Sequence, residues 1–360
     1  MLPNPEKILQ ALSEVTDPTT KKKLSVTAQS CVISLEGTAA SITLPLGYPL
    51  RNGADELKKR IETAVQSVGA SVASLDFTLQ VQSHAVQSGL RPMPNVRNII
   101  AVASGKGGVG KSTTAVNLAL ALQAQGARVG LLDADIYGPS VPIMLGLSGK
   151  PRTVNDNMML PLQGHGLQAN SIGFLIDHDA PAIWRGPMVT QALMQLLNQT
   201  QWDNLDYLII DMPPGTGDIA LTLSQKVPLT GAVIVTTPQD LALADARKGL
   251  RMFQKVNVPV LGLVENMSVH VCSKCGHAEP IFGQHGGQHM ANECGVPWLG
   301  ALPLQLSIRE QTDSGRPTVV AEPEGQAAGI YHDIAARVAA QVSVLPVESP
   351  FKPTVVARKT

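Results

Sequence analysis

The sequence predicts an α/β protein: a small α+β domain, followed by a larger domain built on a doubly wound, mostly parallel sheet. Three observations lead to this prediction. From residue 97 onward, short runs of Val, Ile, Leu and Ala alternate with helical stretches, a pattern typical of parallel strands that helices cover on both faces. One of these runs leads directly into a glycine-rich loop and a helix. With 44% hydrophobic and 16% charged residues among 360, the chain can form a core and lacks the composition of a disordered protein.

The small domain is expected over residues 1–87. A helix at 5–15 precedes strands at 25–35 and 39–44, and a second helix at 55–67 precedes a strand at 72–81. Residues 88–96 contain Gly and two Pro in Ser-Gly-Leu-Arg-Pro-Met-Pro-Asn-Val, which is the composition of a linker.

The larger domain is expected over residues 97–345, with strands at 99–103, 129–132, 207–210, 232–235 and 260–264. A last helix at 329–344 carries apolar residues at every fourth position, which indicates core packing. Parallel strands joined by right-handed crossovers place a ligand crevice at their carboxyl ends. The tail, residues 346–360, is expected to be loose.

The charge balance excludes one class of function. Lys and Arg number 28 against 28 Asp and Glu, so no global basic field attracts nucleic acid or anionic lipid. No apolar run reaches the ~18 residues of a membrane span, and the first residues lack the features of a secretion signal. With four cysteines in a chain of this length, a disulfide scaffold is not expected. We therefore expect a cytoplasmic protein without nucleic-acid or membrane partners.

The strongest motif is the loop that follows the first strand of the larger domain. Gly105, four further residues, Gly110, Lys111 and Ser112 form a complete phosphate-binding loop between a strand and a helix. Glycines let backbone N–H groups approach phosphate oxygens, and the helix amino terminus adds partial positive charge. Lys111 is expected to reach the β- and γ-phosphates, and the Ser112 hydroxyl to bind Mg²⁺. The whole loop predicted to bind ATP comprises Gly105, Lys106, Gly107, Gly108, Val109, Gly110, Lys111, Ser112 and Thr113.

Carboxylates end two further strands. Asp133 and Asp135 follow one buried run, and Asp211 ends another, where it is suited to holding Mg²⁺ through water. The turn at 213–218, Pro-Pro-Gly-Thr-Gly-Asp, follows Asp211 closely enough to respond to a γ-phosphate.

A pair of cysteines, Cys272 and Cys275, stands in a polar loop after the last strand. This spacing lets both sulfurs turn toward one metal, but two thiolates do not complete a tetrahedral set. A symmetric dimer would supply four thiolates, enough for one [4Fe–4S] cluster. A zinc site completed by His270, His277, His285 or His289 is an equal alternative from the residues alone. Cys31 and Cys294 are expected to be buried small hydrophobes, and the histidines to lie at the surface or in loops.

The loop resembles that of the MinD/ParA-like and nitrogenase-iron-protein-like ATPases, because Lys106 adds a second lysine to the motif. This resemblance implies that the larger domain is a P-loop NTPase domain. It implies that Lys106 reaches the phosphates of a partner chain and that Asp135 orients the attacking water. It further implies that Asp211 is linked to Mg²⁺ and that Asn266 recognises adenine. Lys106, Lys111 and Asp135 are thus the expected catalytic residues.

A closer resemblance is to the Mrp/ApbC family of iron–sulfur cluster carrier ATPases. It rests on the motifs shared over about residues 97–345: Asp-Met-Pro-Pro-Gly-Thr-Gly-Asp at 211–218, Trp-Arg-Gly-Pro at 184–187, Glu-Asn-Met at 265–267, and the Cys272/Cys275 pair. The resemblance implies an ATP hydrolase that binds ATP, Mg²⁺ and a [4Fe–4S] cluster, the cluster lying between two subunits of a homodimer. The implied partners are upstream cluster scaffolds and apo iron–sulfur proteins. The first domain resembles a domain found in iron–sulfur assembly factors.

Three other functions stay open at this point. A MinD/ParA-like positioning ATPase would bind membrane or DNA, which the neutral charge disfavours. An electron-donating ATPase like the nitrogenase iron protein uses two widely separated cysteines per chain, whereas here they are close. A zinc-stapled regulatory ATPase is the remaining alternative.

Overall fold

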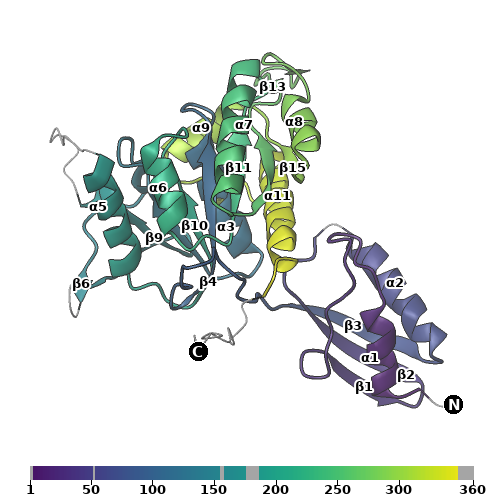
Figure 1. Cartoon of the computed structure of the whole chain (residues 1–360). Coiled ribbons are helices and arrows are strands. Elements are labelled where there is room, and N and C mark those ends of the chain that lie inside the picture. The colour runs from purple at the N-terminus through teal and green to yellow at the C-terminus, as the bar shows by residue number, and fades with distance from the viewer. Residues whose placement is uncertain (1–2, 52, 155–157, 176–185, 348–360) are drawn as a thin grey trace, which may run out of the picture.

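The computed structural model describes residues 3–51, 53–154, 158–175 and 186–347. Trp184 and Arg185 of the 184–187 motif, and positions 348–360 of the expected tail, lie outside these residues. Figure 1 shows a larger α/β part and, apart from it, a smaller part formed by the amino-terminal residues.

The larger part contains the predicted parallel sheet. Among the described residues the sheet has eight strands, and every neighbouring pair is parallel except β8 and β9, which are antiparallel. In spatial order they are β15 (Trp298–Ala301), β12 (Val260–Glu265), β11 (Gly231–Thr236), β4 (Val96–Ser104), β10 (Leu205–Asp211), β5 (Val129–Asp133), β9 (Leu167–Ser171) and β8 (Leu162–Gly164). The five predicted strands and the α/β class are confirmed. Strands β8, β9 and β15 were not predicted, because all three are short and polar residues interrupt β8 and β9.

Helices cover both faces of this sheet, which makes it doubly wound (Figure 1). Ile100 and Val102 of β4 pack in one core with α3 and α11, while Ile99 and Ala101 pack in a second core with α5, α6, α7 and α8. The first layer contains α3 (Lys111–Ala124) and α11 (Gln326–Ser343), with the shorter α4 (Val141–Met144), α9 (Leu306–Asp313) and α10 (Thr318–Ala321) beside them. The second contains α5 (Gly186–Gln199), α6 (Asp218–Lys226), α7 (Asp240–Lys255) and α8 (Gly286–Cys294). Because β4 is buried on both faces, its continuous apolar sequence is explained.

Short elements join the main ones. They are β6 (Thr153–Val154), β7 (Met158–Met159), η2 (Ile172–Phe174), β13 (His270–Val271) and β14 (Ala278–Glu279). In the described part of the chain, no helix combines the length and apolar character needed to cross a membrane.

The smaller part is a three-stranded sheet with two helices packed against it (Figure 1). Its elements are α1 (Pro5–Ser13), β1 (Val32–Glu36), β2 (Ala39–Leu46), α2 (Ala54–Ser67) and β3 (Ser71–Leu79), with β2 between β1 and β3. The strand predicted at 25–35 is wrong over residues 25–31. There the Thr27 amide donates to Ser30 Oγ and the Cys31 amide donates to the Thr27 carbonyl, and such local bonds compete with strand pairing. Cys31 itself is buried, as predicted.

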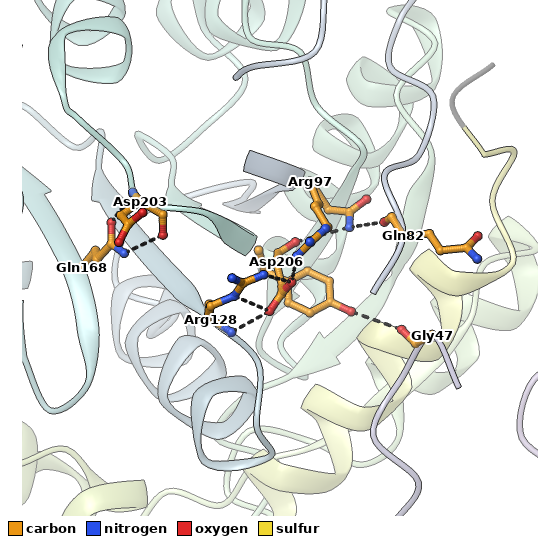
Figure 2. A network of polar contacts seen from close by, with 9 residues as sticks. Gly47, Gln82, Arg97, Arg128, Gln168, Asp203 and Asp206 are labelled. Carbon is orange, nitrogen blue, oxygen red and sulfur yellow. Dashed lines mark hydrogen bonds and ion pairs between the residues drawn. The ribbon is translucent and has the colours of Figure 1, made fainter. Parts of the chain in front are cut away.

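The two parts touch where β2 and β3 end. Gly47 lies so close to α11 that an added Cβ would be 2.9 Å from Ser343 Cβ, so a side chain at this position would disturb the contact. Arg51 Nε donates to Asp333 Oδ1 of α11 over 3.0 Å. The Gly47 carbonyl also accepts a hydrogen bond of 3.5 Å from the Tyr207 hydroxyl of β10 (Figure 2).

The start of β10 holds its neighbours together through Asp206 (Figure 2). Its side chain is 11% exposed, and the carboxylate accepts hydrogen bonds from Arg97 of β4 and from the Arg128 guanidinium and amide ahead of β5. These charges are paired at the edge where the strands of the sheet begin, and they stabilise that edge. The opposite edge is the one where the strands end.

A buried histidine forms part of the contact between the two parts. His84 is 2% exposed, and its Nδ1 lies 2.9 Å from Asn98 Oδ1. Because the Asn98 amide group donates to the Gln82 carbonyl, Oδ1 is the acceptor and His84 donates. The expectation that the histidines lie at the surface or in loops is wrong for His332, which is buried in helix α11; His84 lies outside the named helices and strands but is buried.

The stability of the chain should therefore depend on pH through His84. Burial lowers the pKa of His84 below its ordinary value of 6.5. Below that pH the unfolded chain binds a proton that folded His84 resists, so the free energy of unfolding should fall between pH 7.5 and pH 5.5. His84→Gln should make this fall smaller, with His332 contributing part of the remainder because its pKa is also lowered. Urea unfolding at both pH values tests this, with the exposed His289→Gln as control. An equal fall in wild type and His84→Gln would contradict it.

Candidate functional site

The strand order brings the predicted site residues to one edge of the sheet. β4 lies between β10 and β11, and Asp211 is paired in register with Val102 on one side and Asp133 on the other. The loop after β4 and the carboxylates that end β10 and β5 are therefore neighbours. They lie at the carboxyl ends of the strands, the edge where the sequence predicts a ligand site.

The glycines of the loop have two structural roles: some allow other parts of the chain to pack closely, and others leave the backbone open. An added Cβ on Gly105 would lie 2.1 Å from the Asp245 carbonyl carbon of α7, and one on Gly110 would lie 2.0 Å from Asn266 Nδ2. These two glycines are needed because other parts of the chain pack tightly on them. At Gly107 and Gly108 an added Cβ would meet nothing within 4 Å. The backbone there borders open space into which phosphate groups fit.

Lys111, the first residue of α3, is held by the carboxylates around it. Its side chain is 6% exposed, and Nζ donates to Asp211 Oδ1 over 2.6 Å and lies 3.8 Å from Asp135 Oδ2. Ser112 Oγ accepts a further hydrogen bond from Nζ at 3.1 Å. The structure thus brings three other predicted residues, Ser112, Asp135 and Asp211, within reach of the Lys111 ammonium group.

Asp211 has an oxygen that suits a cation. The residue is fully buried, and while Oδ1 accepts from Lys111, Oδ2 has no hydrogen-bond partner among the described residues. A buried carboxylate oxygen of this kind is costly unless a cation or water satisfies it. With the Ser112 hydroxyl close by, the oxygen donors fit Mg²⁺, which prefers carboxylate, hydroxyl and water ligands.

Asp133 organises the loop that carries Asp135. Its carboxylate is fully buried and accepts from the amides of Asp135, Ser140 and Val141 and from Ser171 Oγ of β9. Burial and then the charge of Asp211 raise the pKa of Asp133. The sequence marked Asp133 as a strand-end carboxylate without assigning it a role. Its four donors come from a turn and from an unpredicted strand, which only the fold brings to it.

Asp135 is less buried than Asp133 and Asp211. Its side chain is 13% exposed, and burial raises its pKa while the nearby Lys111 ammonium opposes that effect. A carboxylate that is partly exposed and close to the loop lysine is suited to contact water beside a bound phosphate.

The turn at 213–218 packs on the beginning of the loop. The Gly215 amide donates to the Ser104 carbonyl over 2.9 Å, and Gly215 has a φ of +89°. Ser104 Oγ in turn donates to the Lys106 carbonyl at 2.8 Å. The half-buried Lys106 is thus fixed at its backbone.

Asn266 contacts the loop from the end of β12. Its Nδ2 donates to the Val109 carbonyl over 2.9 Å, and its side chain lies against Gly110. Glu265, beside it, is buried and accepts from the Gly287 amide at the start of α8. The sequence singled out Glu265 only as part of a motif; its partner lies 22 residues further on, which no local pattern reveals.

Cys272 and Cys275 lie on the hairpin of β13 and β14, which we call the thiol hairpin (residues 270–279). The Cys272 amide donates to the His277 carbonyl, and the Gly276 amide donates to the Cys272 carbonyl, both over 2.9 Å. Cys275 is exposed and Cys272 half-buried. Backbone N–H groups of Lys274 and Cys275 lower the pKa of Cys272. The pair is therefore accessible, and the lowered pKa of Cys272 makes its thiolate, the form that binds metals, easier to reach.

The remaining potential ligands do not gather around this pair. Within the described ranges, no group of three or more His, Cys, Asp and Glu side chains is arranged to hold a metal ion. Cys294, at the end of α8, is half-buried rather than buried as predicted, and its Sγ lies 3.6 Å from Arg247 Nη1.

Comparisons with known proteins agree with this site. The family model described as NUBPL iron-transfer P-loop NTPase matches residues 95–339, and one described as iron–sulfur cluster assembly protein matches residues 5–74. An iron–sulfur cluster carrier protein of Haemophilus influenzae is 50% identical over 96% of this chain and 95% of its own length. The mouse iron–sulfur cluster transfer protein NUBPL is 47% identical over 87% of this chain and 96% of its own.

Solved structures show the same fold. A nucleotide-binding protein of Archaeoglobus fulgidus in complex with ADP is 37% identical, with a TM-score of 0.56 over 64% of this chain and 90% of its own. The cell division ATPase MinD of Pyrococcus furiosus, at 24% identity and a TM-score of 0.51 over 67% of this chain and 98% of its own, shares the fold. From the match over residues 95–339 and the near full-length relatives, the chain belongs to the family of iron-transfer P-loop NTPases.

Proposed function

We propose that this chain binds ATP and Mg²⁺ at the loop of residues 105–113 and holds a [4Fe–4S] cluster between two copies of itself. It then passes the cluster to apo iron–sulfur proteins. The observation that carries the proposal is the position of the thiols. An accessible Cys272/Cys275 pair stands on a hairpin only six residues after Asn266, which contacts the nucleotide loop.

The residues at the loop account for nucleotide binding. Backbone N–H groups around Gly107 and Gly108 border the open side of the loop, and Lys111 supplies a positive charge for the β- and γ-phosphates. Ser112 and Asp211 would hold Mg²⁺, which neutralises phosphate charge when bound. Asn266 uses Nδ2 for the loop, so its Oδ1 is the atom to accept a hydrogen bond from the adenine amino group.

Hydrolysis is transfer of the γ-phosphoryl group to water, in which the chain positions and neutralises charge rather than forming a bond. Asp135 accepts a hydrogen bond from the attacking water and orients it. Lys111 exchanges its bond to Asp211 for phosphate oxygens, and its charge stabilises the transition state. Lys106 of a second copy would add charge at the same phosphates, as the family resemblance implies.

The cluster needs two chains. Each chain offers two close thiolates, and a [4Fe–4S] cluster takes four. Two thiol hairpins related by a twofold axis supply four equivalent ligands. Since Cys275 is exposed, an acceptor protein can approach the cluster and exchange its own ligands for these.

We further propose that the chain divides into a domain at 1–87, a linker at 88–96 and an ATPase domain at 97–345. The separate hydrophobic core of the smaller part supports the division.

A transfer assay tests the proposal. The chain is loaded with iron and sulfide without oxygen and mixed with an apo-enzyme that needs a [4Fe–4S] cluster for activity. Enzyme activity should appear in proportion to the cluster supplied, should persist with an iron chelator present, and should change in rate when ATP is added. Activation that the chelator abolishes would mean release of free iron and would contradict the proposal.

A further inference from the structure

We infer that Asn266 is a positioning residue that passes the state of the nucleotide loop to the thiol hairpin. The inference deepens the proposed function and rests on it in two respects: the loop binds ATP, and the hairpin carries the cluster ligands.

The first step is the contact at the loop. The Asn266 side chain donates from Nδ2 to the Val109 carbonyl over 2.9 Å, and the residue is 9% exposed. The peptide group that joins Val109 to Gly110 is planar and trans, so its carbonyl and its N–H point in opposite directions. By holding the carbonyl, Asn266 aims the Gly110 N–H away from itself. A phosphate that pulls on the N–H groups of this loop turns the same peptide plane that Asn266 grips.

The second step is the fit of the amide over Gly110. Gly110 has a φ of +79°, and an added Cβ would lie 2.0 Å from Nδ2. The side chain of Asn266 thus fills the space over this part of the loop. A shift of the loop backbone by a fraction of an ångström must displace either the amide or the hydrogen bond, because packed interiors do not deform smoothly.

The third step is the path from Asn266 to the thiols. The Asn266 amide donates to the Thr236 carbonyl of β11 over 2.7 Å, and Met267 turns the chain with a φ of +57°. The next residues then run beside the segment after β15. The Ser268 amide donates to the Leu302 carbonyl, the Leu304 amide to the Val269 carbonyl, and the Val271 amide to the Leu304 carbonyl, over 2.8 to 3.1 Å.

This path ends at the first cysteine. Cys272 follows Val271 directly, and its own amide closes the thiol hairpin on the His277 carbonyl. We call residues 266–272 the connecting segment. Because backbone hydrogen bonds recur along it between Asn266 and Cys272, it can transmit a displacement that a free loop would absorb. A change at the γ-phosphate would therefore alter the exposure and spacing of the two sulfurs.

The test measures hydrogen exchange of the backbone amides in the full-length chain without a cluster. Samples carry saturating ADP or a non-hydrolysable ATP analogue, each with Mg²⁺, and occupancy is checked by titration. In the wild type, exchange across residues 268–280 should differ between the two nucleotides by about fivefold or more, the size of a typical coupling between sites. Equal exchange with both nucleotides would overturn the inference.

Two variants decide whether the connecting segment is the path. Leu304→Pro removes the amide that donates to Val269 and leaves Asn266 and the loop untouched. Asn266→Asp keeps the shape of the side chain but replaces its donor with a charged acceptor. In both variants the difference in amide exchange between the two nucleotides should disappear at 268–280. With saturating nucleotide, the difference should remain at 105–113. If both variants kept the wild-type difference in exchange between the two nucleotides at 268–280, the inference would be overturned.

Leu306→Pro is the matched control. Leu306 is the first residue of α9 and half exposed, and proline is tolerated at the first position of a helix. This variant should retain the nucleotide effect, and its loss there as well would show that any disturbance of 304–306 suffices and would overturn the assignment of the path. Because no cluster is used, the result is independent of whether the chain binds [4Fe–4S]; failure of the proposed function shows itself only on loading with iron and sulfide.

Discussion

Replacing Lys111 with alanine should lower the turnover number for ATP hydrolysis by about 10²–10³-fold, the usual cost of removing one preorganised charge from a transition state. The ammonium group is buried at the loop, 2.6 Å from Asp211 and 3.8 Å from Asp135, so no other side chain replaces it. Phosphate release measured at saturating ATP tests this. Lys226→Ala, which removes an exposed lysine at the end of α6, should leave the rate unchanged. Lys111→Gln gives a second variant should the alanine variant lose stability through the unpaired Asp211.

Mixing two inactive variants tests the role of Lys106 across the dimer. If Lys106 acts on the partner's nucleotide, a mixed dimer of Lys106→Ala and Lys111→Ala chains has one site with both lysines and one with neither. Equal mixing then restores about a quarter of the wild-type sites, since half of the dimers are mixed and each has one intact site. If Lys106 acts within its own chain, or if the chain hydrolyses ATP as a monomer, mixing restores nothing.

Replacing Cys272 or Cys275 with alanine should abolish stable cluster binding. In a homodimer each substitution removes two of the four thiolates, so the bound iron that survives desalting should fall by about tenfold or more. Absorbance in the visible range and iron analysis after anaerobic loading measure this. ATP hydrolysis by the variants should remain measurable, because neither cysteine contributes to the contacts of Lys111, Asp211 or Asp135.

Cys294→Ala is the matched control for this prediction. Cys294 is half-buried at the end of α8, with its sulfur against Arg247, and its loss should leave the bound iron at the wild-type level. A cluster that depended on Cys294, or that persisted without Cys272, would contradict the assignment of the ligands.

Much of the fold follows from local sequence. The five buried runs became central strands because continuous Val, Ile and Leu residues are stable only where helices cover both faces, and β4 is the clearest case. Strand β9, with the sequence Leu-Gln-Ala-Asn-Ser, could not be predicted in this way. Its place in the sheet is decided by its neighbours β5 and β8, because propensity is weak in a short polar strand.

In the candidate site too, some residues could be placed from local sequence and others could not. Lys111, Ser112 and Asp211 could be placed because their chemistry is tied to a strand–loop–helix motif and to strand ends. The hydrogen bond between Asp133 and Ser171 joins residues 38 positions apart, and that of Asn266 to the Val109 carbonyl joins residues 157 positions apart. Contacts of this kind depend on how the strands are ordered in the sheet, and no local pattern in the sequence reveals that order.

The most direct test of the account is the iron, sulfide and zinc content of the anaerobically loaded chain, measured together with its mass in solution. A cluster shared by two thiol hairpins predicts a brown dimer with about two iron and two sulfide per chain and no zinc. A colourless monomer that retains one tightly bound zinc after exposure to iron and sulfide would contradict it.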